Sequence, residues 1–69
     1  MQQVQYFHSR RLLEALEFAR KSGFPIKLAP ACAYGEWVKR ADNEEEFKTL
    51  FKKAARRSPG NEVEVQVLA

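Results

Sequence analysis

Short turn signals, together with the helix cap expected at Ser9, divide this chain into six segments, each about as long as one strand or one helix. The signals are Ser22-Gly23, Pro30, Asp42-Asn43 and Ser58-Pro59-Gly60-Asn61. Because Gly, Pro, Asn and Asp favour backbone conformations that interrupt regular structure, we expect elements to end at these positions. The chain has 69 residues and no internal repeat or linker, so we expect one small domain over residues 1–69.

Four of the segments have the pattern of a strand. Residues 62–67 alternate strictly between polar residues and valine, as a strand with one buried face does. Residues 2–7 also alternate, with Val4 and Tyr6 on the face that we expect to be buried. Residues 24–29 and 34–41 are shorter strand candidates. Pro25 and Pro30 bracket the first of these, and because proline donates no backbone hydrogen bond we expect an edge strand there.

Two segments have the apolar spacing of a helix. The first covers residues 10–21, and Ser9 is the expected N-cap. The second follows Asp42 and Asn43, which have capping-box spacing to Glu45 and Glu46. Its apolar stripe consists of Phe47, Leu50, Phe51 and Ala54.

The order strand, helix, strand, strand, helix, strand predicts an α+β fold of the split βαβ, or ferredoxin-like, plan. We expect a four-stranded antiparallel sheet with both helices on one face and right-handed crossovers. In this plan the first and third strands are central, and the second and last lie at the edges. The expected core is Val4, Tyr6, Leu12, Leu16, Ala19, Ile26, Leu28, Phe47, Leu50, Phe51, Val63, Val65 and Val67, with Leu50 and Phe51 among its least accessible residues.

The composition of the chain indicates in which part of the cell the protein is found. No apolar run approaches the roughly 20 residues of a membrane span, and residues 1–5 lack the features of a signal peptide. A single cysteine, Cys32, cannot form an internal disulfide. We therefore expect a cytoplasmic protein that does not enter a membrane.

The residues that commonly carry catalysis are scarce. His8 and Cys32 are each the only residue of their type, and a structural zinc site needs about four such ligands. Glu44, Glu45 and Glu46 lie in the first turn of a predicted helix, where they complement its dipole. No glycine-rich phosphate loop is present. We therefore expect no catalytic residues, no cofactor and no metal, and a protein that is not an enzyme.

The charges are mildly unbalanced, with a net charge of +3. The bases between Lys48 and Arg57 follow three glutamates on the same predicted helix, which is the order that the helix dipole favours. From residue 42 onward there are five bases and six acids, so the excess lies in the first 41 residues. Arg10 and Arg11 oppose the dipole of the first helix, and a residue that violates a local rule can mark a function.

Aromatic residues provide a second indication of a binding surface. Trp37 lies on the third predicted strand, either in the core or on the open face of the sheet, and the sequence leaves both alternatives open. On the open face it would stack on a base or anchor a protein partner. The candidate partner-binding residues are Tyr34, Trp37, Lys39, Arg40, Arg10 and Arg11.

These features favour a non-enzymatic binding module that docks onto another protein, such as a small regulator or inhibitor of the kind that mobile elements encode. The alternative is a nucleic-acid-binding protein that uses Arg10, Arg11, Lys39, Arg40 and Trp37. Residues 62–68 alternate without proline, so self-association, if it occurs, is expected to use the last strand or the open sheet face, and the sequence leaves monomer and homodimer both open.

Overall fold

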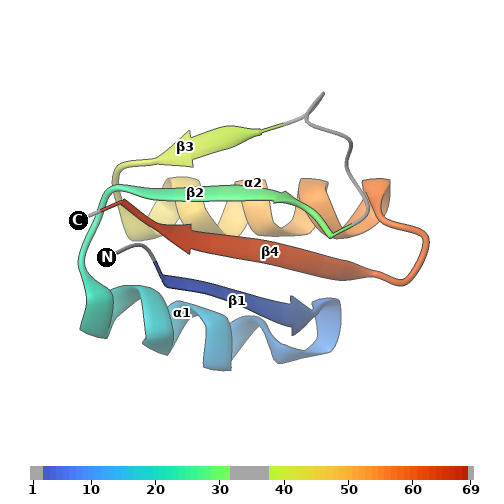
Figure 1. Ribbon diagram of the computed structural model, residues 1–69, viewed down its shortest axis with the longest axis horizontal. Coiled ribbons are helices and arrows are strands. Elements are labelled where there is room, and N and C mark those ends of the chain that lie inside the picture. Colours follow the sequence, from blue (N-terminus) through green and yellow to red (C-terminus); the bar gives the residue numbers. More distant parts are fainter. Residues whose placement is uncertain (1–2, 32–37, 69) are drawn as a thin grey trace.

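The computed structural model of the protein describes residues 3–31 and 38–68 (Figure 1). The elements are β1 (Gln3–His8), the 3-10 helix η1 (Ser9–Arg11), α1 (Leu12–Ser22), β2 (Ile26–Pro30), β3 (Lys39–Ala41), α2 (Glu44–Arg57) and β4 (Glu62–Val67). The strands form one antiparallel sheet, and buried residues of both helices belong to one hydrophobic cluster with it. The predicted α+β class and βαββαβ order are therefore confirmed.

The order of the strands in the sheet differs from the expected one. It is β1-β4-β2-β3, so β4 and β2 are central, whereas β1 and β3 form the edges (Figure 1). Val65 of β4 lies opposite Gln5 of β1 on one side and Leu28 of β2 on the other. Because β4 is paired along both sides, the prediction that the chain self-associates through the edge of its last strand is wrong.

β2 is central although it contains a proline. Pro25 precedes the strand, and Pro30 is its last residue, so neither interrupts the ladder. The missing N–H of Pro30 is followed at once by the N–H of Ala31, which donates to the carbonyl oxygen of Glu62 at 3.0 Å. The prediction that β2 is an edge strand is therefore wrong, because a proline at the end of a strand removes few of its backbone hydrogen bonds.

The face of β1 that packs against the helices is the opposite of the predicted one. The side chains of Val4 and Tyr6 are 44% and 57% exposed, so both are wrongly assigned to the core. Phe7 packs against the core instead, with its ring centroid 5.7 Å from that of Phe18. The Tyr6 hydroxyl donates to Glu64 Oε1 at 3.2 Å, and this bond raises the pKa of Tyr6.

A side-chain cap precedes both α2 and η1, whereas α1 follows η1 without one. Asn43 Oδ1 accepts a hydrogen bond from the N–H of Glu46 at 2.9 Å, as the sequence predicted. Glu46 Oε1 in turn accepts from the N–H of Asp42 at 2.9 Å, so the capping box is shifted by one residue. At the first helical segment His8, rather than Ser9, is the N-cap.

The core lies between the sheet and the helices. Its largest fully buried side chains are Phe47, Phe51, Ile26, Leu28, Val63 and Val65. The rings of Phe47 and Phe51 stack with their centroids 5.9 Å apart. Leu50 is half-buried rather than fully buried, because it lies at the side of α2 that faces β3.

An ion pair joins the end of α1 to the start of α2. The Arg20 guanidinium donates two hydrogen bonds of 2.9 Å to the Glu44 carboxylate. These bonds lower the pKa of Glu44 and raise that of Arg20. Figure 1 shows that the helices run antiparallel, so the start of α1 and the end of α2 lie at the same end of the molecule, opposite this ion pair.

We expect Phe51→Ala to lower the free energy of unfolding by about 3–5 kcal/mol, because it leaves a cavity at the centre of the core. Leu50→Ala should cost clearly less, since part of that side chain already faces water. Urea denaturation followed by circular dichroism measures both variants. Equal losses would contradict the described burial of these neighbours.

The Arg20–Glu44 pair predicts an acid-dependent loss of stability. The pKa of Glu44 is lower in the folded protein than its ordinary value of 4.5. The contribution of Glu44 to the free energy of unfolding is therefore fully present at a pH above its ordinary pKa. This contribution is lost as the pH falls through the lowered pKa of the folded protein. We expect Arg20→Gln to raise the pKa of Glu44, as read by NMR titration of its side-chain carboxyl carbon. An unchanged pKa would show that the ion pair does not form in solution.

Candidate functional site

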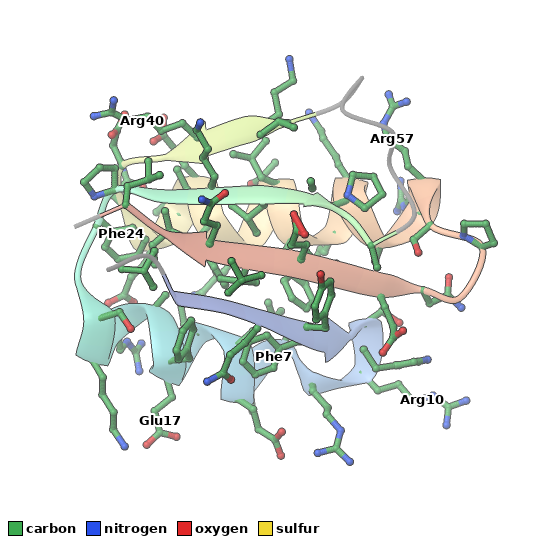
Figure 2. All side chains as sticks on the ribbon, viewed as in Figure 1. Phe7, Arg10, Glu17, Phe24, Arg40 and Arg57 are labelled. Atoms are coloured by element: carbon green, nitrogen blue, oxygen red, sulfur yellow. The ribbon has the colours of Figure 1, made fainter. Side chains whose placement is uncertain are left out.

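The predicted partner-binding residues do not form one site. Arg10 and Arg11 lie in η1, directly after the edge strand β1, whereas Lys39 and Arg40 lie in β3 at the opposite edge of the sheet. Figure 2 shows Arg10 and Arg40 at different ends of the molecule. Tyr34 and Trp37 lie outside the described residues. The sheet order is the cause, because β4 and β2 separate the strands that we expected to be neighbours.

The start of the first helical segment contains two unusual residue choices. His8 Nδ1 accepts a hydrogen bond from the N–H of Arg10 at 3.1 Å, in a position that Ser, Thr, Asp or Asn usually occupies. Arg10 and Arg11 follow, where cations oppose the helix dipole. Arg11 is paired with Glu14 at 3.1 Å, so part of its charge is offset.

Leu13 is the most exposed large apolar side chain of the described residues, at 79%. It precedes Arg20 by about two helical turns, so the two lie on the same side of α1. Lys52 follows Glu44 by about two turns on α2. Because the helices are antiparallel and Arg20 contacts Glu44, Leu13 and Lys52 both lie toward the end of the helix pair that is opposite this contact.

The end of α2 contributes further cations near η1 and the start of α1. The N–H of Ser9 donates to the carbonyl oxygen of Asn61 at 2.8 Å, which holds η1 beside the turn after α2. Between them is a hollow of about 260 Å³, lined by Ser9, Phe51, Lys52, Ala55, Arg56 and Asn61. Lys52 and Arg56 line this hollow, and Arg10 and Leu13 lie on the adjoining η1 and the start of α1. We call these four residues the basic end surface.

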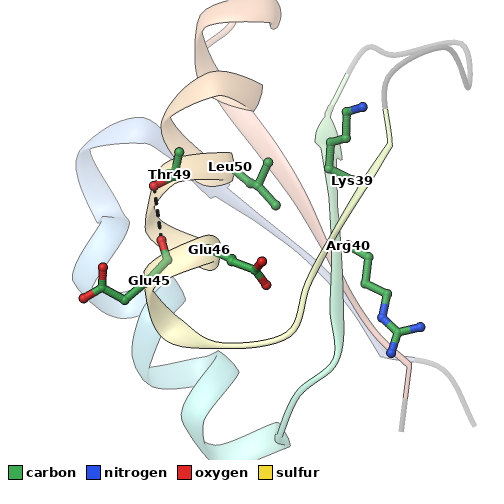
Figure 3. A pocket seen from close by; sticks show the side chains of 6 residues that line it. All are labelled: Lys39, Arg40, Glu45, Glu46, Thr49 and Leu50. Carbon is green, nitrogen blue, oxygen red and sulfur yellow. Dashed lines mark hydrogen bonds between the residues drawn. The ribbon is translucent and has the colours of Figure 1, made fainter.

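A groove separates β3 from α2 along the edge of the molecule. One half, of about 410 Å³, is lined by Lys39, Arg40, Glu45, Glu46, Thr49 and Leu50 (Figure 3). The other half, of about 400 Å³, is lined by Lys39, Leu50, Lys53, Arg56 and Arg57. Because Lys39 and Leu50 line both halves, we treat them as one edge groove.

The two halves of the edge groove differ in charge. Figure 3 shows Glu46 and Leu50 pointing from α2 toward β3. Arg40 donates from Nε to Asp42 Oδ1 at 2.8 Å, so its charge is partly offset. The half that contains Glu45 and Glu46 is therefore mixed in sign, whereas the half beside the end of α2 is basic.

Sequence reasoning missed the cations near the end of α2. Lys52, Lys53, Arg56 and Arg57 each fit the dipole of their own helix, and this local explanation concealed where they lie relative to other elements. The available signal was topological. Two right-handed crossovers on one face of a sheet give antiparallel helices, which places the end of the second beside the start of the first.

The open face of the sheet has a shallow hollow among its described residues. This hollow, of about 160 Å³, is lined by Lys27, Leu28, Ala29, Val38, Glu64 and Gln66. The exposed residues Val4 and Tyr6 lie on the same face. Self-association through the open face stays a prediction.

Comparisons with models of protein families, with curated proteins and with solved structures found no match. Within residues 3–31 and 38–68, no group of three His, Cys, Asp or Glu side chains is placed to hold a metal ion. In the same part of the chain, no helix is long and apolar enough to cross a membrane. The function must therefore be inferred from the described surfaces.

If His8 is present for a purpose other than helix capping, a better cap should stabilise the protein. We expect His8→Asn to raise the free energy of unfolding by about 0.5–1 kcal/mol, because an Asn side chain accepts more favourably from the first helical amides. Ser9→Ala is the matched control, and we expect it to change stability by less than about 0.5 kcal/mol. A loss of stability in His8→Asn, measured by urea denaturation, would contradict this.

Proposed function

We propose that the protein is a non-enzymatic binding module that docks onto an acidic surface of another protein, as a small regulator or inhibitor does. The observation that carries this proposal is the exposure of Leu13 within the basic end surface. At 79% exposure, the large apolar side chain of Leu13 buries little surface within the fold of the protein itself. It would gain from burial against a partner.

The composition of this surface supports a protein partner. Protein interfaces commonly combine apolar anchors with arginine, and a few such residues carry most of the binding energy. Leu13 is the apolar anchor here, with Arg10 and Arg56 as the arginines. A partner that presents carboxylates around an apolar depression would complement the surface in both shape and charge.

The surface is also held in place before a partner arrives. The Arg20–Glu44 hydrogen bonds join the two helices at one end, and the Ser9–Asn61 bond holds η1 at the other. Phe51, which lines the adjacent hollow, is fully buried. Side chains on such a support lose little conformational freedom on binding, which favours affinity.

The proposal is tested by affinity purification from the native host with nuclease treatment, followed by binding measurements on the purified partner. We expect Leu13→Ala to weaken binding by about 2 kcal/mol or more, chiefly through faster dissociation. Neutralising Arg10 and Arg56 to Gln should chiefly slow association and reduce its dependence on salt.

The matched control is Val4→Ala, which removes another exposed apolar side chain on the open face of the sheet. It should leave binding unchanged. A partner whose affinity falls with Val4→Ala and not with Leu13→Ala would move the docking surface to the sheet and overturn the assignment.

Binding to nucleic acid is the second candidate, and one observation favours it. Arg56 lines both the hollow beside η1 and the basic half of the edge groove, so cations continue from Arg10 across α2 to Lys39. A nucleic-acid backbone that followed this path would place its phosphates against basic side chains at both edges of the sheet. Arg40 and Arg11, which we expected to take part, already have carboxylate partners.

Salt dependence separates the two functions. Phosphate contacts release counterions, so binding to generic DNA or RNA would weaken steeply with salt. Arg10→Gln with Arg56→Gln would then reduce the slope by nearly two units, since each cation accounts for about one. Suppose that the protein binds generic DNA or RNA with micromolar affinity at about 150 mM salt, that the double variant abolishes this binding, and that Leu13→Ala does not affect it. These results together would favour nucleic acid over protein as the ligand.

A further inference from the structure

The half of the edge groove beside the end of α2 is lined by cations from two elements. Lys39 comes from β3, and Lys53, Arg56 and Arg57 come from α2, around a hollow of about 400 Å³. The described residues that line it include no carboxylate, and Leu50 is their one apolar member. Like charges gathered in this way repel one another in the folded state.

The dipole of α2 does not account for this arrangement. It favours cations within the last turn of the helix, which covers Arg56 and Arg57. Lys53 lies a turn earlier, and Lys39 belongs to a different element altogether. Arg57 has an interaction of its own. Lys39, Lys53 and Arg56 form no ion pair with a carboxylate of the described residues.

We propose that this half of the groove is a binding site for a compact small molecule with more than one phosphate group. A phosphate group carries up to two negative charges and several strong acceptor oxygens, which matches a cluster of lysine and arginine. Arg56 adds a planar guanidinium that can bind two phosphate oxygens at once. The hollow lies within the range of sizes usual for small-molecule sites.

The other half of the groove sets the size of the anion. Glu45 and Glu46 line it, about two turns before Lys53 on the same helix. An acidic peptide or nucleic-acid strand laid along the whole groove would meet these carboxylates and be repelled. An anion confined to the basic half avoids them, which favours a small polyphosphate-bearing ligand over an extended chain.

The test uses pyrophosphate and tripolyphosphate as probes, with the ionic strength held constant by sodium chloride. We expect both to raise the melting temperature saturably, because a ligand that binds only the folded state stabilises it by mass action. Tripolyphosphate should bind more tightly, since it offers more charge to the same cations. Amide NMR shifts should change at Lys39, Lys53 and Arg56.

Lys39→Gln with Lys53→Gln should weaken binding by at least about tenfold, because each lysine contributes a charge-assisted contact. The matched control is Lys27→Gln with Lys48→Gln, which removes the same charge outside the groove and should change affinity less than about twofold. Leu13→Ala should leave anion binding intact, so failure of this site and failure of the docking proposal are distinguishable.

Three results would overturn the proposal. The first is a rise in melting temperature that does not saturate, or that chloride reproduces at equal ionic strength. The second is an equal loss of affinity in the control double variant. The third is tighter binding of a hexaglutamate peptide than of tripolyphosphate, which would make an acidic protein segment the ligand of the groove.

Discussion

The position of β4 between β1 and β2 is the constraint on which the rest of the structure depends. Val63, Val65 and Val67 point into the core, while the backbone of the same strand pairs on both sides. With β4 and β2 in the centre, β3 becomes an edge strand beside α2. The edge groove exists only because of this order, since a central β3 would have a neighbouring strand where the groove now opens.

The two helices make the molecule electrically asymmetric. At one end, Arg20 and Glu44 neutralise each other across the helix pair, and Glu45 and Glu46 complement the start of α2. At the other end, η1 and the end of α2 both contribute cations. The basic end surface and the basic half of the edge groove are two parts of this one imbalance, with Arg56 between them. An apolar anchor distinguishes the first, and a hollow lined from two elements, β3 and α2, distinguishes the second.

Local features of the fold could be predicted from the sequence, and relations between elements could not. The alternation of residues 62–67 predicted β4 correctly, and the spacing of Phe47 and Phe51 predicted the buried side of α2. The strand order was wrong because periodicity says which face is buried and not which strands are neighbours. The face of β1 was wrong because Tyr6 and Phe7 are both large and apolar, so either alternation was compatible with the pattern.

The candidate site was predicted only in part for the same reason. Arg10 and Lys39 were identified, but each belongs with cations of α2 that the helix dipole had explained locally. The exposure of Leu13 was not predicted, because the apolar spacing of a helix does not say which of its apolar side chains the rest of the fold covers.

Cross-strand NOEs in a uniformly labelled sample test the strand order most directly. The account predicts backbone NOEs from β4 to both β1 and β2, with Val65 close to Gln5 on one side and to Leu28 on the other. NOEs between β1 and β3, with β4 contacting a single neighbour, would contradict it. That result would also remove the edge groove and the site proposed within it.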